Sequence, residues 1–235
     1  MAAKYVFYLQ DFNRGSFHDA KRIQESLLAG IERRVLVWIA KRTPRSINSD
    51  QLTLLGFVSQ CLAGVCYAVA KLHPYALLIG IVFLGLNWLG DSLDGTLARV
   101  RNQQRPRYGF YVDHICDTIA ALALMGGLAL SGYVHPGIAL GMLIAFLMLS
   151  IESYLATYTL GKFQLSHWIF GPTEIRLLLA IGNVALLRHP MAKLFGREFL
   201  LFDAGGAIAI IGMSVMLVIS SVRHTAQLYR EEPVP

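Results

Sequence analysis

The amino-acid sequence predicts an all-α integral membrane protein with six transmembrane helices, preceded by a cytoplasmic amphipathic helix at the membrane interface. Composition is the first observation that leads to this fold class, because 55% of the 235 residues are hydrophobic and only 15% are charged. A soluble domain carries about 25% charged residues. The second observation is that long apolar segments recur along the chain, and roughly 20 such residues suffice for a helix to cross a bilayer.

Six apolar segments are predicted to be the membrane spans. Pro74, Pro136 and Pro172 lie at breaks between them, where a helix starts or stops without losing an internal hydrogen bond. The fifth segment is the shortest of the six. The predicted spans are Leu52–Lys71, Tyr75–Arg99, Tyr108–Leu130, Pro136–Leu160, Glu174–Leu187 and Leu200–Val222.

The basic residues indicate how these spans are oriented. Seventeen of the 21 Lys and Arg residues fall in the segments on one side of the six spans, and four fall on the other side. Because cytoplasmic segments carry the excess of positive charge, both termini should be cytoplasmic. We therefore expect a multi-pass protein of a bacterial inner membrane or its equivalent, with a cytoplasmic N-terminal segment (1–50), a six-span membrane domain (51–223) and a cytoplasmic tail (224–235).

The segment Phe17–Ala40, before the first span, is predicted to form the amphipathic helix. Apolar side chains recur there at steps of three and four residues, and basic side chains lie elsewhere on the helix. Such a helix beside a membrane span is expected in the cytoplasmic interface; packing against a partner is the alternative. The apolar positions are Ile23, Leu27, Leu28, Ile31, Val35, Trp38 and Ile39, and the basic ones are Lys21, Arg22, Arg33 and Arg34.

Four carboxylates near the cytoplasmic boundary of the second and third spans carry the chemistry. Asp91 and Asp94 are three residues apart on one span, and Asp113 and Asp117 are four apart on the next, so each pair shares a helix face. The connection between these spans is short, which predicts antiparallel neighbours whose acidic faces meet. A charge at membrane depth costs about 2.5–3.5 kcal/mol, and four like charges repel. Oxygen ligands without His or Cys suit Mg²⁺ or Mn²⁺.

Small residues and an arginine accompany the acids. Gly90, Gly95, Ala98 and Gly109 leave room for a ligand or for another backbone. Arg99 offers a fork-shaped donor for phosphate. Metal-holding carboxylates beside an arginine are what phosphoryl transfer requires, because the reaction develops negative charge that cations stabilise.

The two acidic stretches resemble the signature of the CDP-alcohol phosphotransferases, D-x-x-D-G-x-x-A-R followed by G-x-x-x-D-x-x-x-D. All eight fixed residues are present. The family also has six spans, an amphipathic N-terminal helix and a Pro-Asn-x-Leu-Thr-like entry to the first span, of which this chain keeps Leu52-Thr53. The matching stretches are Asp91-Ser-Leu-Asp94-Gly95-Thr-Leu-Ala98-Arg99 and Gly109-Phe-Tyr-Val-Asp113-His-Ile-Cys-Asp117.

The resemblance implies a role for each matching residue. Asp91, Asp94 and Asp113 would hold two Mg²⁺ ions, for which Mn²⁺ can substitute. Asp117 would complete the metal site and act as general base on the acceptor hydroxyl. The acceptor oxygen would attack the phosphorus that bears the alcohol, and CMP would leave. The implied CDP pocket consists of Gly95, Ala98, Arg99 and Gly109.

The resemblance also implies partners. The donor is a CDP-alcohol, the acceptor an alcohol or a lipid, and membrane lipids surround the protein; a homodimer is left open and no nucleic acid is expected. The active site would face the cytoplasm. Two directions remain: CDP-diacylglycerol with a polar alcohol, or a CDP-linked headgroup with a lipid hydroxyl.

Further residues resemble the choline/ethanolamine phosphotransferase branch of this family. In that branch a histidine stands where His114 stands here, which makes it a second catalytic candidate; the alternative is a histidine bonded to a backbone carbonyl. Gly171-Pro172-Thr173-Glu174 similarly resembles an element of that branch. Glu174 is thus a candidate for the acceptor headgroup or a helix cap. Arg176 is a candidate for an acceptor phosphate, with lipid phosphates as the favoured alternative.

Two questions stay open at the level of sequence. Glu152 lies inside the fourth span, so it is a candidate functional residue or a structural partner of His167 or Tyr154. The rival function is a cation transporter or channel with a carboxylate-lined site. Inverted repeats and interrupted spans typical of transporters are not evident, and such a protein has no need of Arg99 and the glycines at these intervals.

Overall fold

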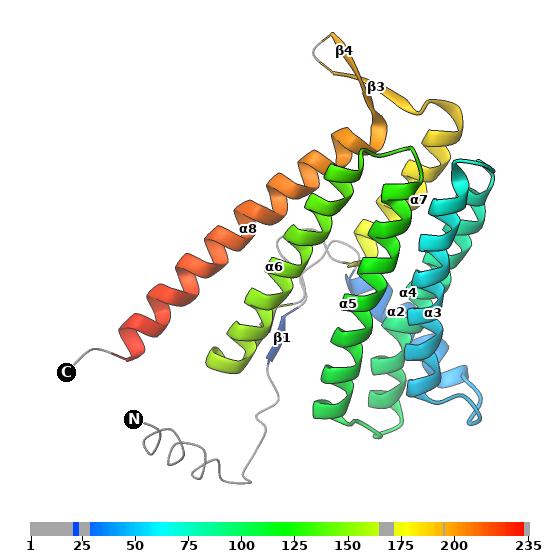
Figure 1. Cartoon of the computed structure of the whole chain (residues 1–235). Helices are drawn as coiled ribbons and strands as arrows, with labels where there is room; N and C mark the ends of the chain where they lie inside the picture. The colour runs from blue at the N-terminus through cyan, green and yellow to red at the C-terminus, as the bar shows by residue number, and fades with distance from the viewer. Residues whose placement is uncertain (1–20, 24–28, 165–171, 195, 233–235) are drawn as a thin grey trace, which may run out of the picture.

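The computed structural model describes residues 21–23, 29–164, 172–194 and 196–232, and helices dominate it (Figure 1). The helices are α2 (Ala29–Arg42), α3 (Ser49–Ala70), α4 (Ala76–Val100), α5 (Pro106–Leu130), α6 (Pro136–Leu160), α7 (Pro172–Arg188) and α8 (Leu201–Glu231). The strands are β1 (Lys21–Ile23), β2 (Lys162–Gln164), β3 (Met191–Leu194) and β4 (Arg197–Leu200).

The all-α membrane fold predicted from the sequence is confirmed. Five helices, α3, α4, α5, α6 and α8, are long and apolar enough to cross a membrane. The fifth predicted span corresponds to α7, which has only 17 residues. The first span starts at Ser49, because the Asn48 side chain accepts the backbone N–H of Gln51 while the Gln51 side chain accepts that of Asn48.

The helix predicted over Phe17–Ala40 is only partly correct. Within the described residues α2 begins at Ala29, and Lys21–Ile23 form β1, which pairs in parallel with β2. Residues 17–20 and 24–28 lie outside the described part. Helical periodicity cannot reveal pairing with a strand about 140 residues further along the chain, which explains the error at β1.

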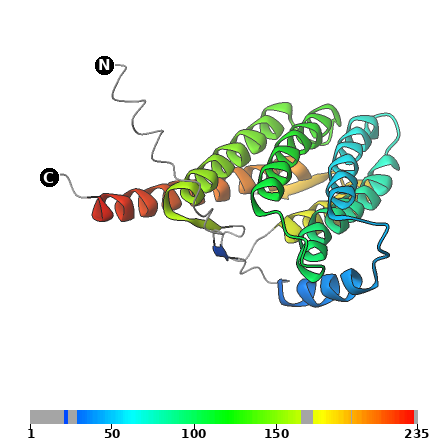
Figure 2. The ribbon, with the colours of Figure 1, turned by 90° about the horizontal axis from the view of Figure 1, so that it is seen from below.

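Helix α2 carries apolar side chains on both its exposed face and its buried face. Ile31, Val35 and Trp38 of the predicted apolar stripe are exposed, whereas Leu36 and Ala40 are buried against the bundle. Figure 2 shows α2 lying across the end of the bundle rather than along it. An exposed apolar face on a helix in this position fits an interfacial location.

Two glycine pairs set how α3 packs in the bundle. A Cβ on Gly90 would lie 2.5 Å from the backbone nitrogen of Gly56, and one on Gly127 would lie 1.9 Å from the carbonyl oxygen of Gly64. Only glycine permits these approaches. The first pair joins α4 to α3 and the second joins α5 to α3. The helices α4 and α5 are antiparallel (Figure 1) but, contrary to the expectation of direct neighbours, each packs mainly on α3.

A short antiparallel hairpin, β3–β4, lies between α7 and α8 at the end of the bundle opposite α2 (Figure 1). The turn residue Gly196 has φ +77°, a left-handed conformation that glycine adopts without strain. The sequence predicts only a loop in this stretch. The hairpin is far from the predicted site. The geometry of that site is set by α3, α4, α5 and α7.

Candidate functional site

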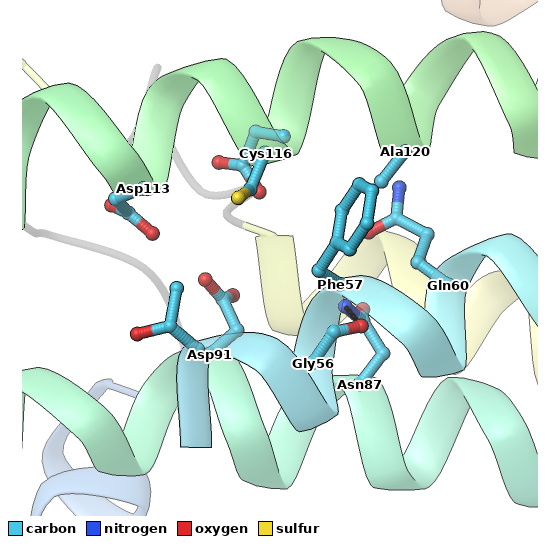
Figure 3. A pocket seen from close by; sticks show the side chains of 10 residues that line it. Gly56, Phe57, Gln60, Asn87, Asp91, Asp113, Cys116 and Ala120 are labelled. Atoms are coloured by element: carbon cyan, nitrogen blue, oxygen red, sulfur yellow. Dashed lines mark hydrogen bonds between the residues drawn. The ribbon is translucent and has the colours of Figure 1, made fainter. Parts of the chain in front are cut away.

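Three of the four predicted acids come together between α4 and α5. Asp91 projects from α4, and Asp113 and Asp117 project from successive turns of α5. One carboxylate oxygen from each lies within 4.8 Å of those of the other two. Figure 3 shows Asp91 and Asp113 directed into the same space. Phe57 of α3 is among the residues that line this pocket.

The fourth acid, Asp94, is tied to α3 instead. Its Oδ2 accepts a hydrogen bond of 2.6 Å from the Thr53 hydroxyl, and its Oδ1 accepts the backbone N–H of Gly95. The Ser49 hydroxyl donates to the Asp94 backbone carbonyl at 2.9 Å. Asp94 therefore borders the three-acid cluster and is held at the start of α3, where the Leu52-Thr53 match to the family entry lies.

Arg176 of α7 lies inside this site. Its Nη2 is 2.6 Å from Asp91 Oδ2, and its Nε donates to Asn87 Oδ1 at 2.6 Å. The amide of Asn87 in turn donates to the carbonyl of Gly56 at 3.0 Å. The Arg176 side chain is only 14% exposed, so it faces the site rather than lipid headgroups, and its buried Nη1 has no hydrogen-bond partner among the described residues.

The donor set of the cluster fits a hard divalent cation. Its three members are carboxylates and supply only oxygen ligands, which Mg²⁺ and Mn²⁺ prefer. Like charges at this separation repel strongly where water is scarce. The guanidinium of Arg176 contributes one positive charge beside Asp91, which offsets part of the repulsion among the three carboxylates.

The four residues assigned to a CDP pocket flank the cluster. Gly95 and Ala98 are partly exposed and Arg99 is exposed at the end of α4, while Gly109 is exposed at the start of α5. A Cβ on Gly109 would meet no atom within 4 Å, so open space lies beside it. Gly90 differs, because its lack of a side chain admits the backbone of α3. A Cβ on Gly95 would contact the guanidinium of Arg99 at 3.6 Å, so of these three glycines Gly90 packs on a helix, Gly95 adjoins Arg99 and Gly109 borders open space.

His114 lies on another side of α5. Its Nδ1 is 2.6 Å from the carbonyl oxygen of Phe110, and its ring stacks on that of Phe110 at 4.2 Å. The ring of Tyr154, on α6, meets it edge-on, with 5.0 Å between the two ring centroids. The carbonyl contact expected for a structural histidine is present. His114 Nδ1 is 3.8 Å from Asp113 Oδ2, so the ring is also next to the acidic cluster.

Two other acids sit apart from the cluster. Glu174 is buried in the first turn of α7. Oε1 of Glu152, on α6, is hydrogen-bonded to Nδ1 of His224, on α8, at 2.6 Å. The sequence pointed to Tyr154 or His167 as the partner of Glu152; His167 lies outside the described residues, and the contact formed is with His224.

Sequence reasoning assigned no role in this region to Asn87 or Glu32, and it placed Thr53 only in the match to the family entry motif. Thr53 and Asn87 hold Asp94 and Arg176, and Glu32 of α2 is buried beside the same turns of α4. Asn87 lies four residues before Asp91, so the helix-face argument that groups the acids would also have included it. Glu32 lies four residues before the buried Leu36, but its partners are distant in sequence.

Comparison with protein families shows the family of the chain. The model of the CDP-alcohol phosphatidyltransferase family matches residues 47–222. The chain belongs to this family. The match covers the acidic signature on α4 and α5 and extends through α7 into α8, whereas α2 precedes it. A search among curated proteins finds no match.

Membership of the CDP-alcohol phosphatidyltransferase family identifies the chain as a membrane-embedded transferase of phosphate-containing groups in phospholipid synthesis. Its substrates in the broad sense are a CDP-alcohol and an alcohol acceptor. The choline/ethanolamine branch is not resolved by the match.

Proposed function

We propose that this protein transfers a phospho-alcohol, as phosphatidyl or headgroup phosphate, from a CDP-alcohol to an acceptor hydroxyl with release of CMP, in a divalent-metal-dependent reaction. The observation that carries the proposal is the cluster of Asp91, Asp113 and Asp117 from two helices, within 4.8 Å of one another. It is formed by the acidic residues of the signature in a chain of the CDP-alcohol phosphatidyltransferase family.

The metal site in this proposal consists of Asp91, Asp113 and Asp117 together with Asp94. The four would hold two Mg²⁺, or Mn²⁺ in their place. When bound, the ions neutralise the negative charge of the pyrophosphate and of the leaving group. Thr53 and Asn87 support this set, because they hold Asp94 and the arginine that contacts Asp91.

Asp117 is proposed as the general base. It lies one turn beyond Asp113 on the same face of α5, so its carboxylate can take the proton of the acceptor hydroxyl. The acceptor oxygen then forms a bond to the phosphorus that carries the alcohol, and the bond from this phosphorus to the CMP oxygen breaks. The released electron pair stays on CMP.

The donor is proposed to lie over the exposed ends of α4 and α5. Gly95, Ala98 and Gly109 leave room for the nucleotide, and Arg99 supplies a donor for the pyrophosphate. The acceptor is proposed to approach Arg176, whose Nη1 has no partner among the described residues. Glu174 lies two residues before Arg176 on the same turn and is the second acceptor candidate.

The test uses purified protein in lipid nanodiscs with Mg²⁺ and two sets of substrates. One set combines CDP-diacylglycerol with polar alcohols, and the other combines CDP-choline or CDP-ethanolamine with diacylglycerol. Release of CMP from one set is expected, and EDTA should abolish it. Absence of CMP with every pair, or activity that resists EDTA, would refute the proposal.

The same assay assigns a role to His114. With a CDP-linked headgroup as donor, His114 acts at the lipid-acceptor entrance and His114→Ala should be nearly as damaging as loss of Asp117. With CDP-diacylglycerol as donor, the ring serves only its packing on Phe110 and Tyr154, and His114→Ala should cost little.

We also propose that the site and both termini face the cytoplasm, with the six-span domain at 51–223 between the segments 1–50 and 224–235. Support comes from the uneven Lys and Arg distribution. Cysteines introduced at Gln103 and His189 should react with an impermeant thiol reagent from opposite sides of the membrane. Reaction of both from outside intact cells would contradict this topology.

A further inference from the structure

Glu32 is a buried acid that the transfer reaction does not use. It lies on the inward face of α2 with Leu36 and Ala40, at steps of four residues, and is only 8% exposed. Burying a carboxylate is costly unless hydrogen bonds compensate it. Burial of this carboxylate in an otherwise apolar stripe therefore has to be explained by its polar contacts, since apolar packing does not compensate its cost.

The contacts of Glu32 join three helices. Its Oε1 accepts hydrogen bonds from Trp88 Nε1 at 2.8 Å and from Ser92 Oγ at 3.1 Å, both on α4. The same oxygen accepts from Thr173 Oγ1, in the first turn of α7, at 2.7 Å. The other oxygen, Oε2, is buried and has no hydrogen-bond partner among the described residues.

These contacts run parallel to those of Arg176. Glu32 contacts residues 88 and 92 of α4, and Arg176 contacts the residues directly before them, Asn87 and Asp91. On α7, Thr173 and Arg176 are three residues apart and so lie on one face. Glu32 thus fixes the same turns of α4 and α7 that Arg176 bridges at the site.

We propose that Glu32 is a positioning residue, which fixes the first turn of α7 against α4 and thereby holds Arg176 on Asp91. A carboxylate suits this role because one oxygen can accept from several donors at once, and hydrogen bonds to a charged acceptor are the stronger kind. An effect of this contact on turnover rests on the proposed function, whereas its effect on the geometry of α7 does not.

Hydrogen–deuterium exchange of the full-length protein in nanodiscs tests the geometry. Glu32→Ala should speed exchange of the backbone amides in the segment 172–178 (Pro172 itself has none) about tenfold, as expected for the loss of the one hydrogen bond that Glu32 makes to α7. Glu32→Gln keeps an acceptor oxygen and should retain most of the protection. Arg33→Ala, an exposed neighbour on α2, is the control and should leave 172–178 unchanged.

Two outcomes would overturn the proposal. Faster exchange confined to α2, with 172–178 at the wild-type rate, would reduce Glu32 to an anchor of α2. If Glu32→Ala cannot be purified, Thr173→Val removes the α7 contact alone, and an unchanged rate at 172–178 in that variant is equally decisive.

The assay of CMP release then separates positioning from loss of general stability. Glu32→Ala should lower turnover about tenfold in the otherwise unchanged protein and less than about twofold in an Arg176→Ala background, because coupled residues are not additive. Equal losses in both backgrounds would show that Glu32 does not act through Arg176. If no CDP-alcohol releases CMP, the proposed function fails, while the exchange result still decides the role of Glu32.

Discussion

Two groups of acidic side chains on the spanning helices have different surroundings. Between α4 and α5, Asp91, Asp113 and Asp117 gather with their oxygens within 4.8 Å of one another. Between α6 and α8, the single acid Glu152 lies 2.6 Å from the imidazole of His224. The first arrangement brings like charges together, and the second pairs an acid with a base.

The difference separates a group of acids whose charges favour binding of a cation from an acid that already has a side-chain partner on a neighbouring helix. Three carboxylates crowded in this way repel one another, and Arg176 contributes only one positive charge, so the cluster favours a function that brings further cations to it. The pair on α6 and α8 is complete in itself. Only 11% of the apolar window of α8 is buried within the protein, and the contact of His224 with Glu152 adds a polar link to the apolar packing of α8 on α6.

The largest expected effect is the loss of activity at the cluster. Asp91→Asn or Asp113→Asn should abolish CMP release, because each removes a charged metal ligand, and EDTA should have the same effect until Mg²⁺ or Mn²⁺ is restored. In metal-free buffer Asp113→Asn should unfold at a higher temperature than the wild type, since one repelling charge is gone, whereas Asp91→Asn should not, because it also removes the partner of Arg176. Full activity in either variant would contradict the two-metal assignment.

The second effect in size concerns Asp117 as a base. Asp117→Asn should lower turnover by about 10²–10⁴-fold, the usual contribution of a positioned base, while CDP-alcohol binding persists. Binding is measured by titration of the nucleotide, and turnover by CMP release. Equal loss of binding and turnover would show that Asp117 serves the metal site alone.

The contrast between the two acidic places was only partly predictable from sequence. Residue spacing along one helix placed Asp91 with Asp94 and Asp113 with Asp117, because helical geometry is local. It could not show that the Thr53 hydroxyl binds Asp94, or that Arg176 reaches Asp91 from 85 residues away. Such pairs depend on how separate helices pack, which periodicity does not encode.

The fold shows the same division. Five of the spans and their order follow from runs of apolar residues and from prolines at the breaks. The role of α3 between α4 and α5 does not, since it depends on glycines that meet across helices, such as Gly56 and Gly90. The pairing of β1 with β2 was missed because it too joins segments that are far apart in the sequence.

The third expected effect is on stability rather than on catalysis. Glu152→Gln should lower the free energy of unfolding by about 1–3 kcal/mol, because it weakens a largely buried hydrogen bond to a group that can carry charge. CMP release at a permissive temperature should stay within about threefold of the wild type. A loss of turnover with unchanged thermal stability would instead assign Glu152 to the reaction.

The smallest effect is expected at another acid, Asp50 in the first turn of α3, which pairs with Arg105 just before α5. The two side chains are 48% and 53% exposed, so water competes with the ion pair and salt screens it. Exposed pairs of this kind contribute about 0–1 kcal/mol to stability.

Asp50→Asn should therefore lower the unfolding temperature less than Glu152→Gln does. The difference from wild type should shrink further in 1 M salt, where the Debye length is about 3 Å. Thermal unfolding in nanodiscs at two salt concentrations measures both. If Asp50→Asn proved the more destabilising of the two, burial would not determine how much each acid contributes to stability. The contrast between the metal-site cluster and the Glu152–His224 pair would then need another cause.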